Sequence, residues 1–188
     1  MKPSKKIINN LRSELNKSFK PLHKMDDIKS WYKKIVKQSR IKIKTIPLNK
    51  CKNWKVNKKG FISHTSGLFY RVEGVRVLNS YKREAKGGWD QPMFTEPGYD
   101  GGILGLLKKK INNTPHYLIN AKFEPGNFNF IQLSPTVQAT FSNIKKAHGG
   151  SEVKFLEFFK SPYKKNCKII FKQWVSEEGG RLRNKRNL

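Results

Sequence analysis

The stretch HYLINAKFEPGNFNFIQLSPTVQATFSNIKKAHGG, residues 116–150, contains the pattern that decides how this chain folds. Residues 117–123 are apolar or β-favouring and lead into a Pro-Gly-Asn turn at residues 125–127, which predicts a strand. Ser134 and Pro135 then form a typical helix start, and apolar residues recur after them at spacings of four and three. A helix over residues 136–147 is therefore predicted.

Polar side chains occupy selected positions in this stretch. Lys122 and Glu124 stand two apart in the predicted strand, so they share a face and place a cation beside a carboxylate. The predicted helix carries uncharged polar residues within a lysine-rich chain, which favours a surface that hydrogen-bonds a ligand; a solvated helix face is the alternative. These residues are Thr136, Gln138, Thr140 and Asn143.

His148 precedes Gly149 and Gly150 at the end of the predicted helix. The helix macrodipole favours a protonated imidazole at that end, and imidazole suits general acid or base catalysis near neutral pH. A helix-capping histidine is the alternative interpretation.

Length and composition favour one folded domain with an appended helical segment, since the chain has 188 residues and is 36% hydrophobic. The formal net charge is +27, and 19 of the 40 Lys and Arg residues lie in the first 60 positions. Such an excess favours anionic partners, namely nucleic acid, acidic lipid or phosphorylated small molecules, without choosing among them.

Several classes of protein and site are not expected from the sequence. It has no apolar run of membrane-spanning length and no signal peptide, which predicts a cytoplasmic protein without membrane contact. Cys51 and Cys167 have no CxxC partner, and the four histidines lack ligand spacing, so neither a disulfide framework nor a metal site is predicted. The usual hydrolase and cofactor motifs are missing.

Residues 1–40 form a basic helical segment, with amphipathic helices predicted over residues 4–19 and from Asp26 onward. Packing on the core or on a dimer partner is the commoner role of such helices, and contact with membrane or nucleic acid is the alternative. Residues 41–188 are predicted to form the main domain, beginning with a strand over residues 41–46.

Residues 68–78 predict a strong strand in which Gly74 indicates a bulge. Arg76 on this strand suits either a phosphate or an exposed cross-strand ion pair. The Gly- and Pro-rich residues 83–102 predict a long functional loop, where Trp89 and Gln91 could hold a base or sugar or simply anchor the loop.

The remaining elements are short. Residues 108–115 predict a hairpin with Asn112 and Asn113 at its tip, and residues 152–159 predict a short helix or strand. Residues 168–175 predict a strand, residues 177–180 a turn, and residues 181–188 the start of a basic strand.

Four motifs together resemble the NDP-hexose 2,3-dehydratases of deoxysugar biosynthesis. They are the stretch at residues 116–150, GWDQPMFTEPGYDGGILGLL, LFYRVEGVRV and QWVSEEGGRLRNKRN. The resemblance runs from about Trp31 to the end of the sequence and implies an α/β (α+β) fold, a Nudix-like mixed β-sheet packed between helices. Relatives contain two tandem Nudix-like units, and this chain resembles the first, with its match ending inside the KRN segment.

The resemblance also implies the chemistry. The Nudix metal-binding box is absent and its helix corresponds to residues 134–147, so metal-independent elimination of water across C2 and C3 of a dTDP-linked 4-keto-6-deoxyhexose is expected. The C4 ketone acidifies the C3 proton, so a base, an acid and an enolate-stabilising donor suffice, and no redox cofactor is required. Implied partners are a second Nudix-like repeat or a homodimer mate, and a downstream NAD(P)H-dependent 3-ketoreductase.

Within the matching motifs, residue chemistry suggests roles. Glu124 and His148 are the candidates for proton transfer. The substrate-binding candidates are Lys122, Arg76 and Arg181 for the diphosphate, Trp89 and Gln91 for the base or sugar, and Gln132, Thr136 and Gln138 for sugar hydroxyls and the ketone. A catalytically inert sugar-nucleotide-binding module is the alternative, and nucleic-acid binding is not expected because no recognised aromatic-basic motif occurs.

Overall fold

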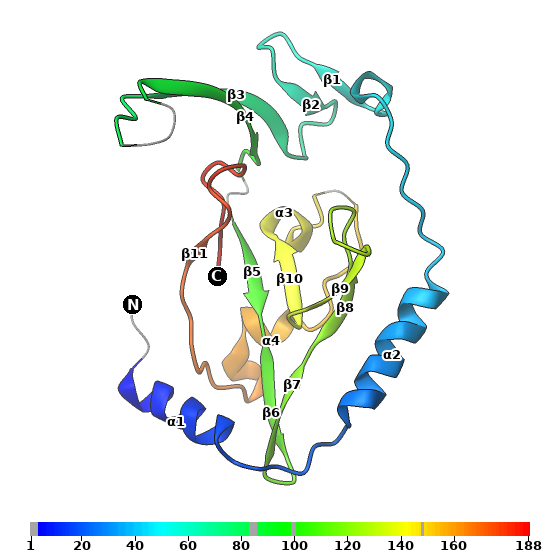
Figure 1. The fold of residues 1–188 in the computed structure, drawn as a ribbon, viewed down its shortest axis with the longest axis vertical. Coiled ribbons are helices and arrows are strands. Elements are labelled where there is room, and N and C mark those ends of the chain that lie inside the picture. The colour runs from blue at the N-terminus through cyan, green and yellow to red at the C-terminus, as the bar shows by residue number, and fades with distance from the viewer. Residues whose placement is uncertain (1–3, 83–85, 99–100, 148) are drawn as a thin grey trace. The chain divides into compact units, whose positions relative to one another are not determined.

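Two helices come first in the chain, and most of the later elements are strands (Figure 1). The computed structural model describes residues 4–82, 86–98, 101–147 and 149–188. Helices α1 (Lys5–Leu15) and α2 (Met25–Gln38) confirm the two predicted N-terminal helices. None of the helices in these ranges is long and apolar enough to cross a bilayer.

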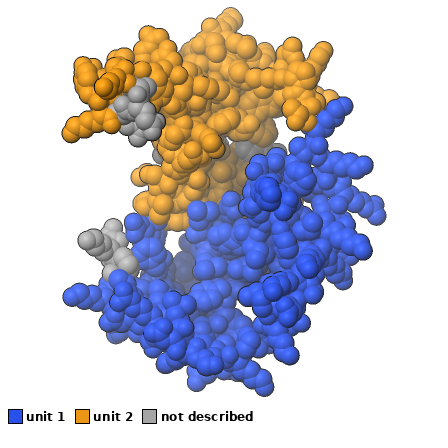
Figure 2. Space-filling model, viewed as in Figure 1, with its two compact units in different colours: residues 1–44, 104–138, 154–173 blue, residues 45–103, 139–153, 174–188 orange. Residues whose placement is uncertain are grey.

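The chain divides into two compact units, coloured separately in Figure 2. Unit 1 comprises residues 1–44, 104–138 and 154–173, and unit 2 comprises residues 45–103, 139–153 and 174–188. Both contain strands together with short or long helices, so the predicted mixed α/β (α+β) class is confirmed.

Two hairpins form most of the strand structure of unit 1. Strands β6 (Leu107–Ile111) and β7 (Thr114–Leu118) pair across a two-residue turn. Asn112 and Asn113 adopt φ of 48° and 63° there, as a type I′ turn requires, and this confirms the predicted hairpin tip. Strands β8 (Asn120–Phe123) and β9 (Ile131–Ser134) pair with Lys122 opposite Gln132.

Helices of unit 1 contact the β8–β9 hairpin and the residue at position 105, which precedes the β6–β7 hairpin. The Tyr32 hydroxyl of α2 donates a hydrogen bond of 2.5 Å to the carbonyl of Ile131, which is itself buried. Phe159 of α4 (Glu157–Lys160) lies against Gly105, where a Cβ would come closer than 3.0 Å to the ring. α4 confirms the short helix predicted within residues 152–159, and the 3₁₀ helix η2 (Pro162–Lys165) follows it.

Unit 2 contains an antiparallel sheet with strand order β1-β2-β3-β4. Its strands are β1 (Trp54–Val56), β2 (Ile62–His64), β3 (Arg71–Leu78) and β4 (Gly88–Thr95), and the 3₁₀ helix η1 (Leu48–Lys50) precedes them. Residues 180–183 run beside β4, because the Phe94 N–H donates to the Arg181 carbonyl at 2.8 Å and the Arg183 N–H donates to the Phe94 carbonyl at 2.9 Å.

A second sheet has the order β10-β5-β12-β11. Its strands are β10 (Val137–Thr140), β5 (Gly101–Gly105), β12 (Arg186–Asn187) and β11 (Val175–Ser176), and β12 pairs parallel to β5. Gly101 and Gly102 have no room for a side chain, since a Cβ would meet the Phe141 ring or the Ala139 carbonyl at under 3.0 Å. Glycine here allows the close approach of neighbouring strands.

The predicted helix over residues 136–147 is wrong in its first half. Residues 137–140 form β10, and only α3 (Phe141–Ile144) is helical. Val137 and Ala139 are buried while Gln138 between them is exposed, which is the period of two expected of a strand. The helix begins at Thr140, whose side chain caps the Asn143 N–H, and not at Ser134.

Several other predictions of local structure are also wrong. Gly74 pairs with Pro92 in an unbroken β3–β4 register, so no bulge is present. Residues 88–95 of the predicted loop form β4, because each of them pairs with a residue of β3. Residues 41–46 form no strand, and the predicted strands over residues 168–175 and 181–188 shrink to the two-residue strands β11 and β12.

Candidate functional site

Four of the predicted site residues come together in unit 1. The Lys122 ammonium lies 2.7 Å from the Glu124 carboxylate, which confirms that both side chains share one face. The same ammonium donates to the Gln138 carbonyl at 2.8 Å, and Gln132 stands opposite Lys122 on β9. We call Lys122, Glu124, Gln132 and Gln138 the Lys122 cluster.

The cluster sits at a strand end fixed by a tight turn. Glu124 follows β8, its N–H donates to the Phe130 carbonyl at 3.0 Å, and its carbonyl accepts from the Asn127 N–H at 3.1 Å. The Glu124 side chain remains 42% exposed and that of Lys122 30% exposed. A carboxylate with an adjacent ammonium is therefore held at a hydrogen-bonded turn and is open to a solvent-borne ligand.

Thr136 has a structural role in unit 1. Its hydroxyl donates to the Leu118 carbonyl and accepts from the Leu107 N–H at 3.0 Å, and the residue is 5% exposed. Because both hydrogen-bonding functions are used, Thr136 joins β7 and β6 to the segment between β9 and β10.

The predicted residues of unit 2 are engaged with protein partners. Arg76 forms a bidentate ion pair with Asp90, with both bonds at 2.8 Å. This hydrogen-bonded pairing raises the pKa of Arg76 and lowers the pKa of Asp90. The cross-strand ion pair, one of the two interpretations of Arg76, is therefore present.

Trp89 and Gln91 form a chain of hydrogen bonds toward the C-terminal segment. The indole N–H of Trp89 donates to the Gln91 side-chain oxygen at 2.6 Å, and the Gln91 amide donates to the Gly180 carbonyl at 2.6 Å. Arg181 forms an exposed ion pair with Glu178 at 3.4 Å. His148 lies outside the residues that the structure describes.

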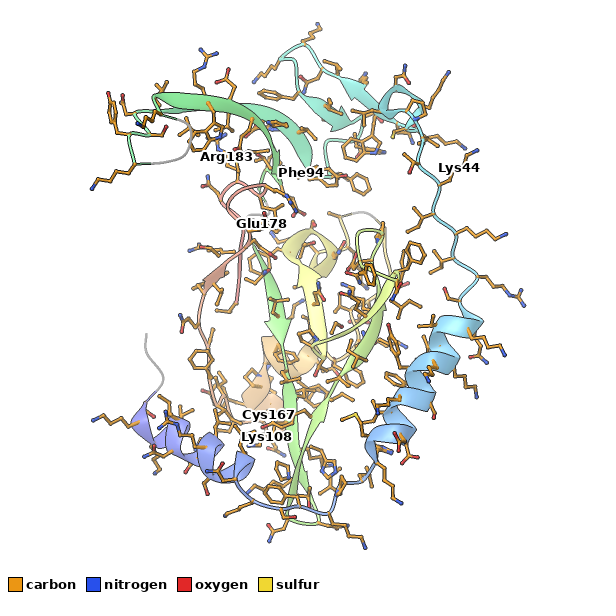
Figure 3. All side chains as sticks on the ribbon, in the orientation of Figure 1. Lys44, Phe94, Lys108, Cys167, Glu178 and Arg183 are labelled. Atoms are coloured by element: carbon orange, nitrogen blue, oxygen red, sulfur yellow. The ribbon has the colours of Figure 1, made fainter. Side chains whose placement is uncertain are left out.

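Sequence reasoning missed a buried carboxylate in unit 2. Glu73 is 4% exposed and accepts hydrogen bonds from Arg183 at 2.6 Å, Thr95 at 2.7 Å and Arg71 at 2.9 Å. The Thr95 hydroxyl and the two guanidinium groups lower the pKa of Glu73, and they outweigh the opposing effect of burial. Arg183 and Phe94, both labelled in Figure 3, mark where the C-terminal segment meets this sheet.

A second missed group surrounds Glu96. Its carboxylate accepts hydrogen bonds from Ser142 and from Lys185, and Ser142 also shares a hydrogen bond of 2.8 Å with Thr140. Lys185 and Glu96 are 9% and 12% exposed. No short-range sequence pattern predicts this group, because Glu96 is separated from both partners by more than 40 positions in the sequence.

The Lys122 cluster can support acid–base chemistry. A partly exposed carboxylate can accept a proton from carbon or oxygen, and the neighbouring cation can hold an anionic group or a developing oxyanion. Within the described ranges, no group of three or more His, Cys, Asp or Glu side chains is placed to hold a metal ion.

The family model described as NDP-hexose 2,3-dehydratase matches residues 25–188. The chain belongs to this family. The family resemblance drawn from the motifs is thereby confirmed.

Curated relatives in the NDP-hexose 2,3-dehydratase family support the same assignment. The chain is 37% identical over 161 residues to a dTDP-4-dehydro-6-deoxy-alpha-D-glucopyranose 2,3-dehydratase of Streptomyces violaceoruber. It is 38% identical over 141 and 143 residues to proteins of the same name from Amycolatopsis orientalis and Saccharopolyspora spinosa. These matches cover 84%, 73% and 76% of this chain. The chain spans about a third of these relatives, which are covered over 35%, 30% and 28% of their length.

Proposed function

We propose that this chain acts in the 2,3-dehydration of a dTDP-linked 4-keto-6-deoxyhexose, by itself or as part of a longer enzyme. The observation that supports this most strongly is the family match over residues 25–188, together with relatives that are named for this reaction. The Lys122 cluster offers the residue types that the reaction needs within the matched region.

The chemistry follows from the acidity of a carbon next to a ketone. Glu124 removes the C3 proton, the resulting enolate places negative charge on the C4 oxygen, and loss of the C2 hydroxyl as water completes the elimination. The Gln132 and Gln138 side chains hold sugar hydroxyls and the ketone, and Lys122 neutralises the diphosphate or the enolate. The enol product tautomerises to a 3,4-diketone, a substrate for an NAD(P)H-dependent 3-ketoreductase.

Other assignments belong to the same proposal. His148 is proposed as the acid that assists the leaving hydroxyl, and Thr136 as a group that orients the strand beside the sugar. Arg76 and Arg181 are proposed as ligands of the diphosphate, and Trp89 and Gln91 as ligands of the base or sugar. A Nudix-like architecture and association with a second repeat or a second copy of the chain complete the proposal, as does function in the cytoplasm.

A second candidate function is a sugar-nucleotide-binding module without turnover. It is favoured by the coverage of the relatives, because about a third of their length corresponds to this chain. Such a module would bind dTDP yet fail to eliminate water.

A coupled assay separates these two functions. The protein is incubated with dTDP-4-keto-6-deoxyglucose, a 3-ketoreductase and NADPH, and absorbance of NADPH is followed. We expect consumption of NADPH, reduced about a hundredfold in Glu124→Gln, since removal of a general base typically costs this much or more.

The matched control is Glu152→Gln, which changes an exposed carboxylate outside the Lys122 cluster. Equal losses of NADPH consumption in Glu124→Gln and Glu152→Gln would show that Glu124 is not the general base. Binding of dTDP without NADPH consumption by the unmodified chain would instead favour the inert module.

A further inference from the structure

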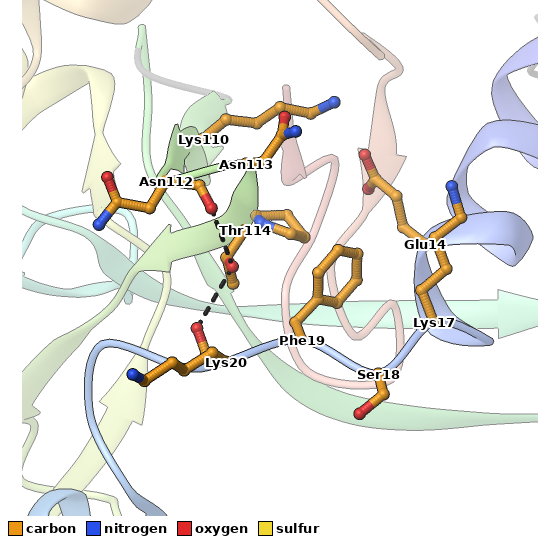
Figure 4. Close-up of a pocket in the computed structure, with 10 residues that line it drawn as sticks. Glu14, Lys17, Ser18, Phe19, Lys20, Lys110, Asn112, Asn113 and Thr114 are labelled. Carbon is orange, nitrogen blue, oxygen red and sulfur yellow. Dashed lines mark hydrogen bonds between the residues drawn. The ribbon is translucent and has the colours of Figure 1, made fainter.

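A pocket of about 470 Å³ lies in unit 1 between the N-terminal arm, residues 5–22, and the β6–β7 hairpin (Figure 4). We call it the arm pocket. The residues lining it from the arm are Glu14, Lys17, Ser18, Phe19 and Lys20, and those from the hairpin are Lys110, Asn112, Asn113, Thr114 and Pro115. None of its lining residues belongs to the Lys122 cluster, and those from the arm precede residue 25, where the family match begins.

Three contacts fix the arm against the hairpin. The Thr114 hydroxyl donates to the Lys20 carbonyl at 3.2 Å, and the Leu22 N–H donates to His116 Nε2 at 3.1 Å. The third is the ion pair between Glu14 and Lys108, whose side chains are 21% and 14% exposed. The pocket is thus bounded on both sides by elements that are held together.

His116 contacts the backbone through both of its ring nitrogens. Nδ1 lies 2.9 Å from the Thr114 carbonyl, so it carries the proton, and Nε2 must then be the acceptor for the Leu22 N–H. His116 therefore connects the end of the arm to β7.

The charge of the arm pocket is positive after internal pairing. Its one carboxylate, Glu14, is neutralised by Lys108, which lies outside the lining. Among the residues that the structure describes, Lys17, Lys20 and Lys110 have no carboxylate within 4.0 Å. Three lysines thus line one concavity without an internal counter-ion, and Lys17 and Lys110 lie on its two walls, an arrangement that attracts a compact anion.

The remaining lining residues suit a phosphorylated ligand. Asn112 and Asn113 are exposed at the hairpin tip and present amide donors, while Figure 4 shows the Phe19 ring between the α1 residues and the hairpin. Amide donors and ammonium groups bind phosphate oxygens, and an aromatic ring can stack a nucleobase. The volume falls within the usual range for small-molecule sites.

We propose that the arm pocket binds a small molecule bearing a diphosphate group, at a site separate from the substrate site proposed above. Lys17 and Lys110 contact the phosphate oxygens from opposite walls, and the Asn113 amide orients them. The ligand is either free diphosphate or a nucleoside diphosphate, and these sources share the chemistry that the pocket recognises.

Calorimetric titration of the 188-residue chain with inorganic pyrophosphate tests the proposal. We expect saturable binding that the double substitution Lys17→Ala, Lys110→Ala weakens about tenfold, since two charge-assisted contacts are lost. The matched control is Lys33→Ala, Lys34→Ala on α2, which removes the same charge from exposed positions outside the pocket and should change the affinity less than about twofold. Far-UV circular dichroism verifies that both variants stay folded.

The control variants also define what would overturn the proposal. Equal weakening in the two double variants means that net charge alone attracts pyrophosphate. Loss of binding in Lys122→Ala but not in Lys17→Ala, Lys110→Ala places the anion at the Lys122 cluster instead. Absence of saturable binding to the unmodified chain removes the site altogether, and none of these results bears on dehydration in the coupled assay.

A titration with dTDP distinguishes the two ligand sources. If the natural ligand is a nucleotide, Phe19→Ala weakens dTDP binding about fivefold or more and leaves pyrophosphate binding unchanged, because only the nucleotide has a base to stack. If both probes respond alike to Phe19→Ala, the pocket recognises the diphosphate group alone.

Discussion

Two glutamates, one in each unit, show what burial does to the same functional group. Glu73 in unit 2 is 4% exposed and accepts hydrogen bonds from three side chains, whereas Glu124 in unit 1 is 42% exposed and pairs with one. The oxygens of Glu73 are committed to the protein, so their interactions stabilise the fold. Glu124 contributes little to stability and can meet a ligand.

The largest effect expected from this comparison is on stability. Glu73→Ala should lower the free energy of unfolding by about 2–3 kcal/mol, because it leaves the groups around a buried carboxylate without their partner. Glu124→Ala should cost at most about 1 kcal/mol, since solvent screens an exposed pair. Urea denaturation of both variants measures the difference, and similar losses would contradict the assignment of distinct roles.

The same contrast predicts a dependence on pH. The pKa of Glu73 is lowered from its ordinary value of 4.5, so its contribution to stability is complete above that pH and is lost as the pH falls through the lowered value. The unmodified chain should therefore lose stability below about pH 4.5, and Glu73→Gln should lose less over the same interval. Urea denaturation of the unmodified chain and of Glu73→Gln, at about pH 7 and at about pH 3, measures how much stability each loses. Identical losses would exclude Glu73 as a source of acid sensitivity.

The smallest expected effect on stability is that of replacing Arg76. Its bidentate pair with Asp90 is exposed at 71% and 62%, so Arg76→Ala should leave the denaturation midpoint unchanged despite the ideal geometry. A change in dTDP affinity without a change in stability would support the proposed role of Arg76 as a substrate ligand. A clear loss of stability would show that exposure alone does not separate residues that stabilise the fold from residues that are free to bind a ligand.

Local chemistry made part of the fold predictable. The Asn112-Asn113 tip could be predicted because asparagine tolerates the left-handed backbone that a type I′ turn needs, and the Lys122–Glu124 contact follows from the two-residue period of a strand. The helix over residues 136–147 failed because the strand β10 enters a sheet with β5, a pairing partner distant in the sequence. Tertiary pairing of this kind overrides a local helix start.

The candidate site also contains residues that local sequence could predict and residues that it could not. The Lys122 cluster lies mostly within one stretch of sequence, so a short pattern could find it. Glu73 and Glu96 were missed because their partners lie far away in the sequence. Arg183 contacts Glu73, and Ser142 and Lys185 contact Glu96. The available signal for Glu73 was an acid in a valine-rich strand two positions from Arg71, since residues two apart in a strand share a face.

The contact between Gly105 and Phe159 constrains how this sequence can vary. A methyl group on residue 105 would lie closer than 3.0 Å to the aromatic ring, so alanine fits there only if the opposing ring becomes smaller. Relatives with a side chain at position 105 should therefore carry a residue such as leucine or valine at position 159. The two positions are expected to change together in evolution. A larger residue at position 105 requires a smaller one at position 159, and the reverse.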